Sequence, residues 1–497
     1  MQIKTFLLSF LTLLPLGASA QGRRFLHYDC QEAQPTHEAV GGASRRYQLA
    51  QLKTDWDSTR VYPVAVVLVS FSNKDFSCED PQDFYNRIFN EEGYNEGRGP
   101  GCVADYFRQQ SSGLFKPHFD IYGPVKLTKG NTTYGNYGDD AFREALLLAA
   151  DSLGVDFSPY VWDRAGRAEA IVFIYAGYGG NESSDATKGC IWPNTNTMSS
   201  ITVNGITMRD CSASAELWTN NRSCGIGTIC HEYSHTLGLP DLYPTRGDEY
   251  SIVDEWDLMD GGNFVNNGWC PPNYSAHEKM LLGWLKPEEL DMPATIEGLK
   301  PLAEGGKAYI IRTDNTNEFF LLENRQWNGW DLRTPGHGLL ISHVDYNASI
   351  WSANNVNNNP NHHRYELVHA DNLDYNDWED IIGDGSTHTG GHSLYLSGTA
   401  YPFVDDSTEN RSFTDTSIPA ATTYSGTGLL SKPINDITEN DDATVSFLFM
   451  NEEMSGIVEL SAQQPERTHA AHDLTGRRVS ASYHGLVIRN GKKFFSR

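Results

Sequence analysis

The segment 225–241, GIGTICHEYSHTLGLPD, constrains this chain more than any other part of it. His231 and His235 are four residues apart, so a helix places both imidazoles on one face, one turn apart. The apolar residues of the segment recur at helical spacing and predict a stripe for the core: Ile226, Ile229, Cys230, Tyr233 and Leu237. Gly238 predicts a break in the chain after the second histidine. The segment therefore predicts a helix packed on a core, with two imidazoles side by side at its end.

Two imidazole nitrogens one turn apart can bind a single Zn²⁺ at about 2.0–2.1 Å. A catalytic zinc takes three protein ligands and keeps one position open. The turn at Gly238 allows the carboxylate of Asp241 to reach the same ion, so we predict zinc ligands at His231, His235 and Asp241. Glu232 then faces a water at the open position, where a carboxylate can accept a proton. This pattern predicts a zinc-dependent endopeptidase with Glu232 as its general base and acid.

Two alternatives stay open at this point. In a gluzincin-type peptidase the third ligand is a glutamate further along the chain, and Glu249 and Glu255 are the candidates. The spacing of Gly238 and Asp241 argues against it. In the second alternative the chain is a secreted adhesin or binding protein on an inactive protease fold. The presence of all the predicted zinc ligands together with Glu232 argues against that alternative.

Further stretches carry a family resemblance. Met259 precedes a glycine-rich turn in WDLMDGG, 256–262, and metzincins place such a methionine beneath their metal. The segments IYAGYG (174–179), AHEKMLLGWL (276–285) and GLLISHVD (338–345) complete the pattern. Together with HEYSHTLGLPDLY, they resemble the immune inhibitor A (thuringilysin-like) family of secreted bacterial zinc metalloproteases over about 60–450. The resemblance implies a metzincin-like fold, Zn²⁺ as cofactor, protein or peptide substrates, and structural roles for Met259 and Gly238.

The residue pattern divides the chain into regions. Strand-like runs at 61–71 and 169–175 alternate with helical spacing at 84–89 and 141–153, which predicts an α/β or α+β catalytic domain over 61–285. From 286 to 450, short alternating segments separated by Asn, Gly and Pro turns predict an antiparallel, β-sandwich-like domain. We also expect a strand within 115–127 at the edge of the substrate cleft.

Both ends of the chain predict export. Residues 1–20 have the basic start, apolar run and small-residue site of a signal peptide, and 21–60 predict an extension or short propeptide. Residues 451–497 predict a linker and a small C-terminal β module, whose basic residues contrast with the acidic body. This tail resembles a type IX secretion sorting domain, which implies the export machinery as a partner; a plain terminal hairpin is the alternative. We expect a secreted or cell-surface protein.

The charge and the cysteine content of the chain limit which partners, disulfides and further metal sites can be expected. The formal net charge of −26 argues against a nucleic-acid partner, and no stretch outside the N-terminus is apolar enough for membrane insertion. Eight cysteines in an exported chain predict disulfides of unknown pairing. The acidic stretch 371–384 could bind Ca²⁺, although its spacing does not match an EF-hand and a solvated loop is favoured.

Overall fold

The computed structural model describes residues 52–451, apart from 164, 170, 183, 247–250 and 374–395, together with four strands between 471 and 496. The chain forms two compact units, Met1–Asn451 and Glu452–Arg497. The predicted signal peptide, nearly all of the predicted extension and most of the acidic stretch 371–384 lie outside the described residues.

The first sheet is built from the strands that the apolar runs predict. Its strands are β1 (Tyr62–Ser70), β2 (Pro117–Lys126), β3 (Ile171–Tyr178), β4 (Asn194–Val203) and β5 (Ile206–Leu217). They lie in the order β2-β1-β3-β5-β4, and all neighbours run parallel except β4, which is antiparallel to β5. Alternate residues of β1 enter two different cores, with Val66 on one face and Val67 on the other. A strand buried on both faces explains the unbroken apolar run in its sequence.

Helices cover both faces of this sheet. The helices of the first unit are α1 (Pro81–Asn90), α2 (Val103–Gln110), α3 (Asp139–Leu153), α4 (Gly227–Thr236), α5 (Ala276–Leu281) and α6 (Ala348–Ser352). Short 3-10 helices span Ser158–Tyr160, Asp254–Trp256, Gly261–Phe264, Leu302–Glu304 and Gly329–Arg333. α3 shares its core with Val67, whereas α1, α2 and α4 share the core of Val66. The helices predicted within 84–89 and 141–153 are confirmed.

The region after residue 285 is dominated by short strands, as its pattern predicts. One sheet has the order β11-β10-β9-β8-β6 and a second has the order β14-β15-β7. The strands are β6 (Glu288–Glu289), β7 (Ala294–Leu299), β8 (Ala308–Arg312), β9 (Glu318–Arg325), β10 (Gly338–Asp345), β11 (Tyr365–Leu367), β12 (Phe403–Val404), β13 (Glu409–Asn410), β14 (Ile434–Glu439) and β15 (Val445–Phe449). A third core lies between these sheets and includes Phe320 and Phe447.

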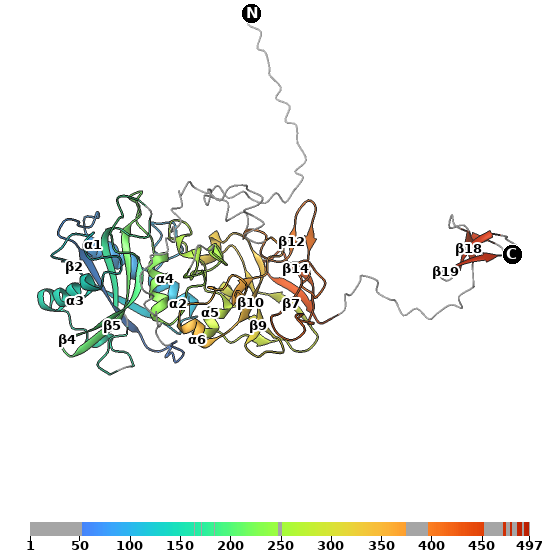
Figure 1. Cartoon of the computed structure of the whole chain (residues 1–497), viewed down its shortest axis with the longest axis horizontal. Coiled ribbons are helices and arrows are strands. Elements are labelled where there is room, and N and C mark those ends of the chain that lie inside the picture. Colours follow the sequence, from blue (N-terminus) through green and yellow to red (C-terminus); the bar gives the residue numbers. More distant parts are fainter. Residues whose placement is uncertain are drawn as a thin grey trace, which may run out of the picture. The chain divides into compact units, whose positions relative to one another are not determined.

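The first core continues across residue 285. Leu321 of β9 and Leu340 of β10 belong to the same apolar cluster as Tyr233 of α4 and Tyr106 of α2. Figure 1 shows α2, α4 and α5 between the first sheet and the strands β9 and β10. The sheet that carries β9 and β10 therefore packs directly against the region that holds the two histidines.

The second unit contains a four-stranded antiparallel sheet. Its strands are β16 (Ala471–Asp473), β17 (Arg478–Val479), β18 (Gly485–Arg489) and β19 (Lys492–Ser496), in the order β17-β16-β18-β19. Pairing of Arg489 with Lys492 makes β18 and β19 a hairpin. The expected β structure of this tail is present; its role in sorting stays a prediction.

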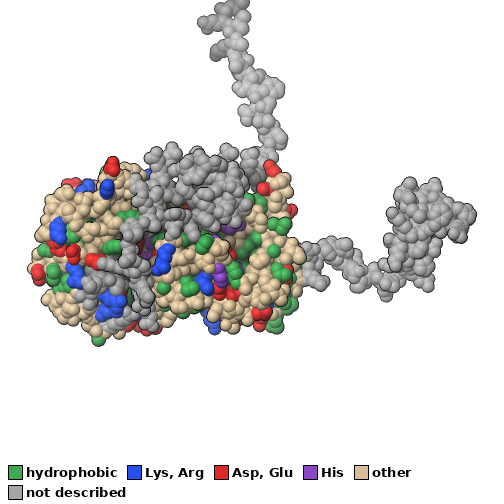
Figure 2. All heavy atoms as spheres, in the orientation of Figure 1, with side chains coloured by type: hydrophobic (Ala, Val, Ile, Leu, Met, Phe, Trp, Pro, Cys, Tyr) green, Lys and Arg blue, Asp and Glu red, His purple; other side chains and the backbone are tan. Residues whose placement is uncertain are grey.

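Acidic and basic side chains are interspersed over the face drawn in Figure 2. Within the described part of the chain, no helix combines the length and apolar character needed to cross a membrane.

The expected disulfides do not form among six of the described cysteines. These are Cys78, Cys102, Cys190, Cys224, Cys230 and Cys270, all present as thiols. All of them except Cys78 are buried, and two have structural roles: Cys102 caps α2 by accepting a hydrogen bond from the amide of Asp105, and Cys230 packs into the first core. Small apolar side chains with these structural uses need no partner sulfur. Cys30 lies outside the described residues.

Candidate metal centre

The helix α4 is flanked by two glycines with positive φ, Gly225 before its first turn and Gly238 after its last. Gly225 has a φ of +68°, and a Cβ there would lie 2.5 Å from the backbone of Gly268. The carbonyl of Gly268 accepts hydrogen bonds from the amides of Ile226 and Gly227, which fixes the start of the helix. At the other end Gly238 has a φ of +101°, a conformation that side chains with a Cβ rarely adopt. The predicted break after His235 is confirmed.

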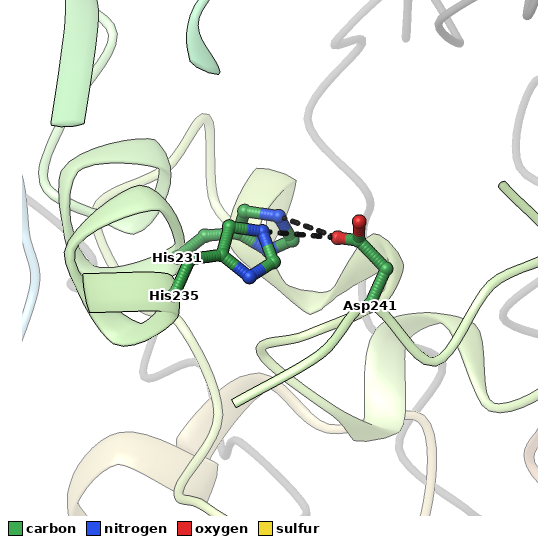
Figure 3. Close-up of side chains that lie close together, drawn as sticks. All are labelled: His231, His235 and Asp241. Carbon is green, nitrogen blue, oxygen red and sulfur yellow. Dashed lines mark ion pairs between the residues drawn. The ribbon is translucent and has the colours of Figure 1, made fainter. Parts of the chain in front are cut away.

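The side chains of His231, His235 and Asp241 converge (Figure 3). Oδ1 of Asp241 lies 3.1 Å from Nε2 of His231 and 3.2 Å from Nε2 of His235. All three residues are buried. The other ring nitrogens lie near backbone carbonyls, with Nδ1 of His231 2.8 Å from the oxygen of Leu258 and Nδ1 of His235 2.7 Å from that of Leu239. When the imidazoles are neutral, as metal ligands must be, these contacts favour the tautomer with the proton on Nδ1, so that both Nε2 lone pairs face Asp241.

This donor set fits a zinc ion. Four ligands at about 2.0–2.1 Å in a tetrahedron lie about 3.3 Å from one another, close to the two separations observed here. Oδ1 of Asp241 is buried and faces the two Nε2 atoms, a position from which it can share one cation with them. No second group of three or more His, Cys, Asp or Glu side chains is gathered this closely within the described residues.

In the metal-free protein the imidazoles and the carboxylate stabilise one another as charged groups, and a bound metal would displace the protons of the imidazoles. Burial alone would lower the pKa of His231, but the hydrogen bond with Asp241 and the charge of Glu232 outweigh it and raise the pKa to about 9. Burial would raise the pKa of Asp241, yet the neighbouring imidazoles hold that pKa well below its ordinary value. The carboxylate of Asp241 is therefore ionised and available as a ligand at neutral pH.

Glu232 lies beside the three converging residues and is itself nearly buried. Burial raises the pKa of Glu232, and the neighbouring imidazoles partly offset this effect. The single hydroxyl proton of Thr195 has two acceptors on Glu232, the backbone oxygen at 2.5 Å and Oε2 at 2.9 Å. Thr195 is on β4, the antiparallel edge strand, whereas the strand expected at the cleft edge, β2, occupies the opposite edge of the sheet. The sequence gives no signal for Thr195, because the register of β4 decides which residue meets α4.

Met259 lies in the turn that follows the 3-10 helix Asp254–Trp256 and is fully buried. Its carbonyl accepts a hydrogen bond from the amide of Leu242, one residue after Asp241. The carboxylate of Asp257 accepts from the amide of Met259 at 2.8 Å, and the next carbonyl along, that of Leu258, contacts His231. The turn therefore supports both the first histidine and the segment that carries the third side chain.

Two further residues at this centre were not predicted. The ring of Tyr243 stacks on that of His231, with centroids 6.4 Å apart, and its side chain hydrogen-bonds with that of Asp241. Asn354, from the loop after α6, donates from Nδ2 to Oδ2 of Asp241 at 2.6 Å. The position of Tyr243 two residues after Asp241 could have identified it. The only signal for Asn354 was the high asparagine content of its loop.

The structure also locates the alternative ligands. Glu255 is buried but does not belong to the converging group, and Glu249 lies outside the described residues. Asp241 is therefore the carboxylate that the fold brings to the two histidines.

Comparisons with known proteins agree with the resemblance seen in the sequence. Residues 174–284 match the family described as Immune inhibitor A peptidase M6, catalytic domain. Immune inhibitor A of Bacillus thuringiensis subsp. alesti is 24% identical over 271 residues, which cover 44% of this chain and 39% of that protein. The chain thus matches about two fifths of the length of this curated relative. The resemblance to the immune inhibitor A family is confirmed, and the matched segment contains the converging side chains, Glu232 and Met259.

Proposed function

We propose that this protein is a zinc-dependent endopeptidase that hydrolyses peptide bonds of protein substrates. The observation that carries the proposal is the convergence of Nε2 of His231, Nε2 of His235 and Oδ1 of Asp241 within a segment that matches a peptidase catalytic domain. Glu232 is placed beside this group, as the hydrolysis of an amide requires of a general base.

The residues of the site have distinct roles in this proposal. His231, His235 and Asp241 would hold the zinc, which when bound supplies Lewis-acid chemistry at the scissile carbonyl. Glu232 accepts a proton from the attacking water while the water oxygen bonds to the carbonyl carbon. The same carboxyl group then delivers this proton to the amine nitrogen as the C–N bond breaks. The burial that raises the pKa of Glu232 favours its acceptance of a proton near neutral pH.

The hydroxyl of Thr195 orients the base. It occupies Oε2 of Glu232, which leaves Oε1 to exchange the proton with water and with the leaving amine. Met259 forms an apolar floor beneath the ligands, as in metzincins, and we propose a metzincin-like catalytic domain over 61–285, followed by a β-rich domain over 286–450.

The proposal includes export. Residues 1–20 would direct secretion and be removed, with 21–60 as an extension or short propeptide. The module within 451–497 would act as a type IX-like sorting domain. The strongly acidic composition of the chain agrees with an extracellular protein. A secreted peptidase would meet its protein substrates outside the cell.

Glu232→Gln tests the function directly. We expect this variant to bind one zinc ion per chain and to lose cleavage of a casein-type substrate, because the amide cannot accept the proton. Glu297→Gln changes an exposed glutamate on β7 and is the matched control, with wild-type turnover expected. Near-normal turnover of Glu232→Gln would refute the assignment of the base.

Metal analysis tests the ligand set separately. Asp241→Ala is expected to lose zinc, whereas Glu255→Ala is expected to retain it. The reverse result would favour the gluzincin-type arrangement. A zinc-loaded wild-type protein that cleaves no peptide in a broad library would favour the binding-protein alternative.

A further inference from the structure

We propose that Asn354 is a positioning residue for the metal ligand Asp241, so that the β-rich region downstream of residue 285 completes the metal site. This inference rests on the proposed zinc site, to which it adds a residue outside the matched segment 174–284. Asn354 and Asp241 are separated by 113 positions in the sequence.

Both the oxygen and the nitrogen of the Asn354 carboxamide form hydrogen bonds with Asp241. Its Oδ1 accepts a hydrogen bond from the backbone amide of Asp241 at 2.7 Å, and its Nδ2 donates to Oδ2 of Asp241 at 2.6 Å. The two oxygens of the Asp241 carboxylate therefore have different partners: Oδ2 faces the amide, and Oδ1 faces the two imidazoles. This division orients Asp241 to bind a metal through Oδ1.

Asparagine suits this position because its side chain carries an acceptor and a donor at once. Asn354 is buried and has a φ of +54°, in the left-handed region that asparagine adopts more readily than most residues. An aspartate there would oppose the charge of Asp241, and an apolar side chain would leave a buried amide and a buried carboxylate oxygen unpaired.

Neighbouring asparagines fix the loop along the same ligand segment. Nδ2 of Asn357 donates to the carbonyl of Leu242 at 2.7 Å and to that of Tyr365, on β11, at 2.8 Å. Oδ1 of Asn358 accepts from the amide of Thr245 at 2.6 Å. The loop 354–358 thus connects the segment 241–245 to strand β11, so hydrogen bonds hold the backbone on both sides of the contact with Asp241.

Loss of a residue that orients a metal ligand typically weakens metal binding by about 10- to 100-fold. The full-length chain with Asn354→Ala should therefore bind zinc about 10- to 100-fold more weakly in a competition with a chromophoric chelator. Asn361→Ala, an exposed asparagine of the same loop region, is the control and should bind zinc as the wild type does. Circular dichroism and thermal unfolding of the metal-free proteins report whether each variant is folded.

A second variant keeps the inference testable if Asn354→Ala does not fold. Asn354→Gly suits the left-handed backbone conformation at this position and removes the carboxamide, so its zinc affinity should also fall. The absorption spectrum of the Co²⁺-substituted protein should change in both variants, because the coordination of Asp241 changes.

The outcomes separate this inference from the proposed function. A wild-type chain that binds no zinc would overturn the metal site itself. A wild-type chain that binds zinc, with folded Asn354 variants of the same affinity within twofold and the same Co²⁺ spectrum, would overturn the role of Asn354 alone.

Discussion

The hydrogen bond between Thr195 and Glu232 makes a quantitative prediction. Thr195→Val removes the hydroxyl but preserves the shape of the side chain, so the buried site is not opened. The hydroxyl lies 2.9 Å from Oε2 of Glu232. A hydrogen bond to a charged group contributes about 1.5–3 kcal/mol, and each 1.36 kcal/mol is a factor of ten in rate. If the bond orients the base only for the reaction, kcat should fall by about 10- to 150-fold.

The assay is steady-state cleavage of a fluorogenic peptide by the zinc-loaded protein. We expect the loss in kcat with little change in KM, because Thr195 orients the base and makes no proposed contact with the remote parts of the substrate. Zinc content should stay at one ion per chain, since none of the proposed ligands bonds to Thr195. Thr195→Ser retains the hydroxyl and is the control, with kcat expected within about threefold of wild type. A Thr195→Val protein with wild-type kcat would refute the idea that this bond orients Glu232.

Other predictions concern stability. Burial would lower the pKa of His343, but hydrogen bonds with Glu318 and Glu366 raise it above 6.5, while the pKa values of both glutamates fall to about 2. The stability that the raised pKa of His343 contributes is fully present below about pH 6.5 and is lost as the pH rises through that pKa. The stability that the two lowered glutamate pKa values contribute is fully present above about pH 4.5 and is lost as the pH falls toward 2. His343→Gln should therefore lower the free energy of unfolding, measured with urea, by about 2 kcal/mol at pH 5.5 and by less at pH 9. A difference that does not change with pH would contradict the hydrogen bonds of His343 with the two glutamates. Asp331→Asn removes the buried partner of Arg325, 2.8 Å from its Nε, and should cost about 3–5 kcal/mol in the same assay; a loss below about 1 kcal/mol would count against it. Removal of the metal with a chelator should lower the Tm, and added zinc should restore it; an unchanged Tm would mean that no ion binds preferentially to the folded chain.

The active-site helix could be predicted because its determinants are local. The four-residue interval between His231 and His235 fixes their common face, and Gly238 fixes where the helix ends. Asp241 is close enough in sequence for its reach to be judged from the turn alone. The apolar strands could be predicted for the same reason, since burial on both faces leaves an unbroken apolar run.

The disulfide prediction failed for the opposite reason. Whether two cysteines bond depends on the distance between their sulfur atoms, which an even count does not encode. Cys102 and Cys230 instead serve as a helix cap and as a core residue. The first core includes residues from both sides of residue 285, and this packing is not encoded in the local residue pattern either.

The sequence by itself determined which groups form the proposed centre: the pair of imidazoles, the adjacent carboxylate of Glu232 and the carboxylate of Asp241. Only the tertiary structure decided which side chains hold these groups in place. Thr195 arrives through the register of an edge strand, and Asn354 arrives from a loop 113 residues away. The periodicity of a sequence reflects which residues share a face of one helix or strand. The contacts of Thr195 and Asn354 depend instead on how separate elements pack against one another.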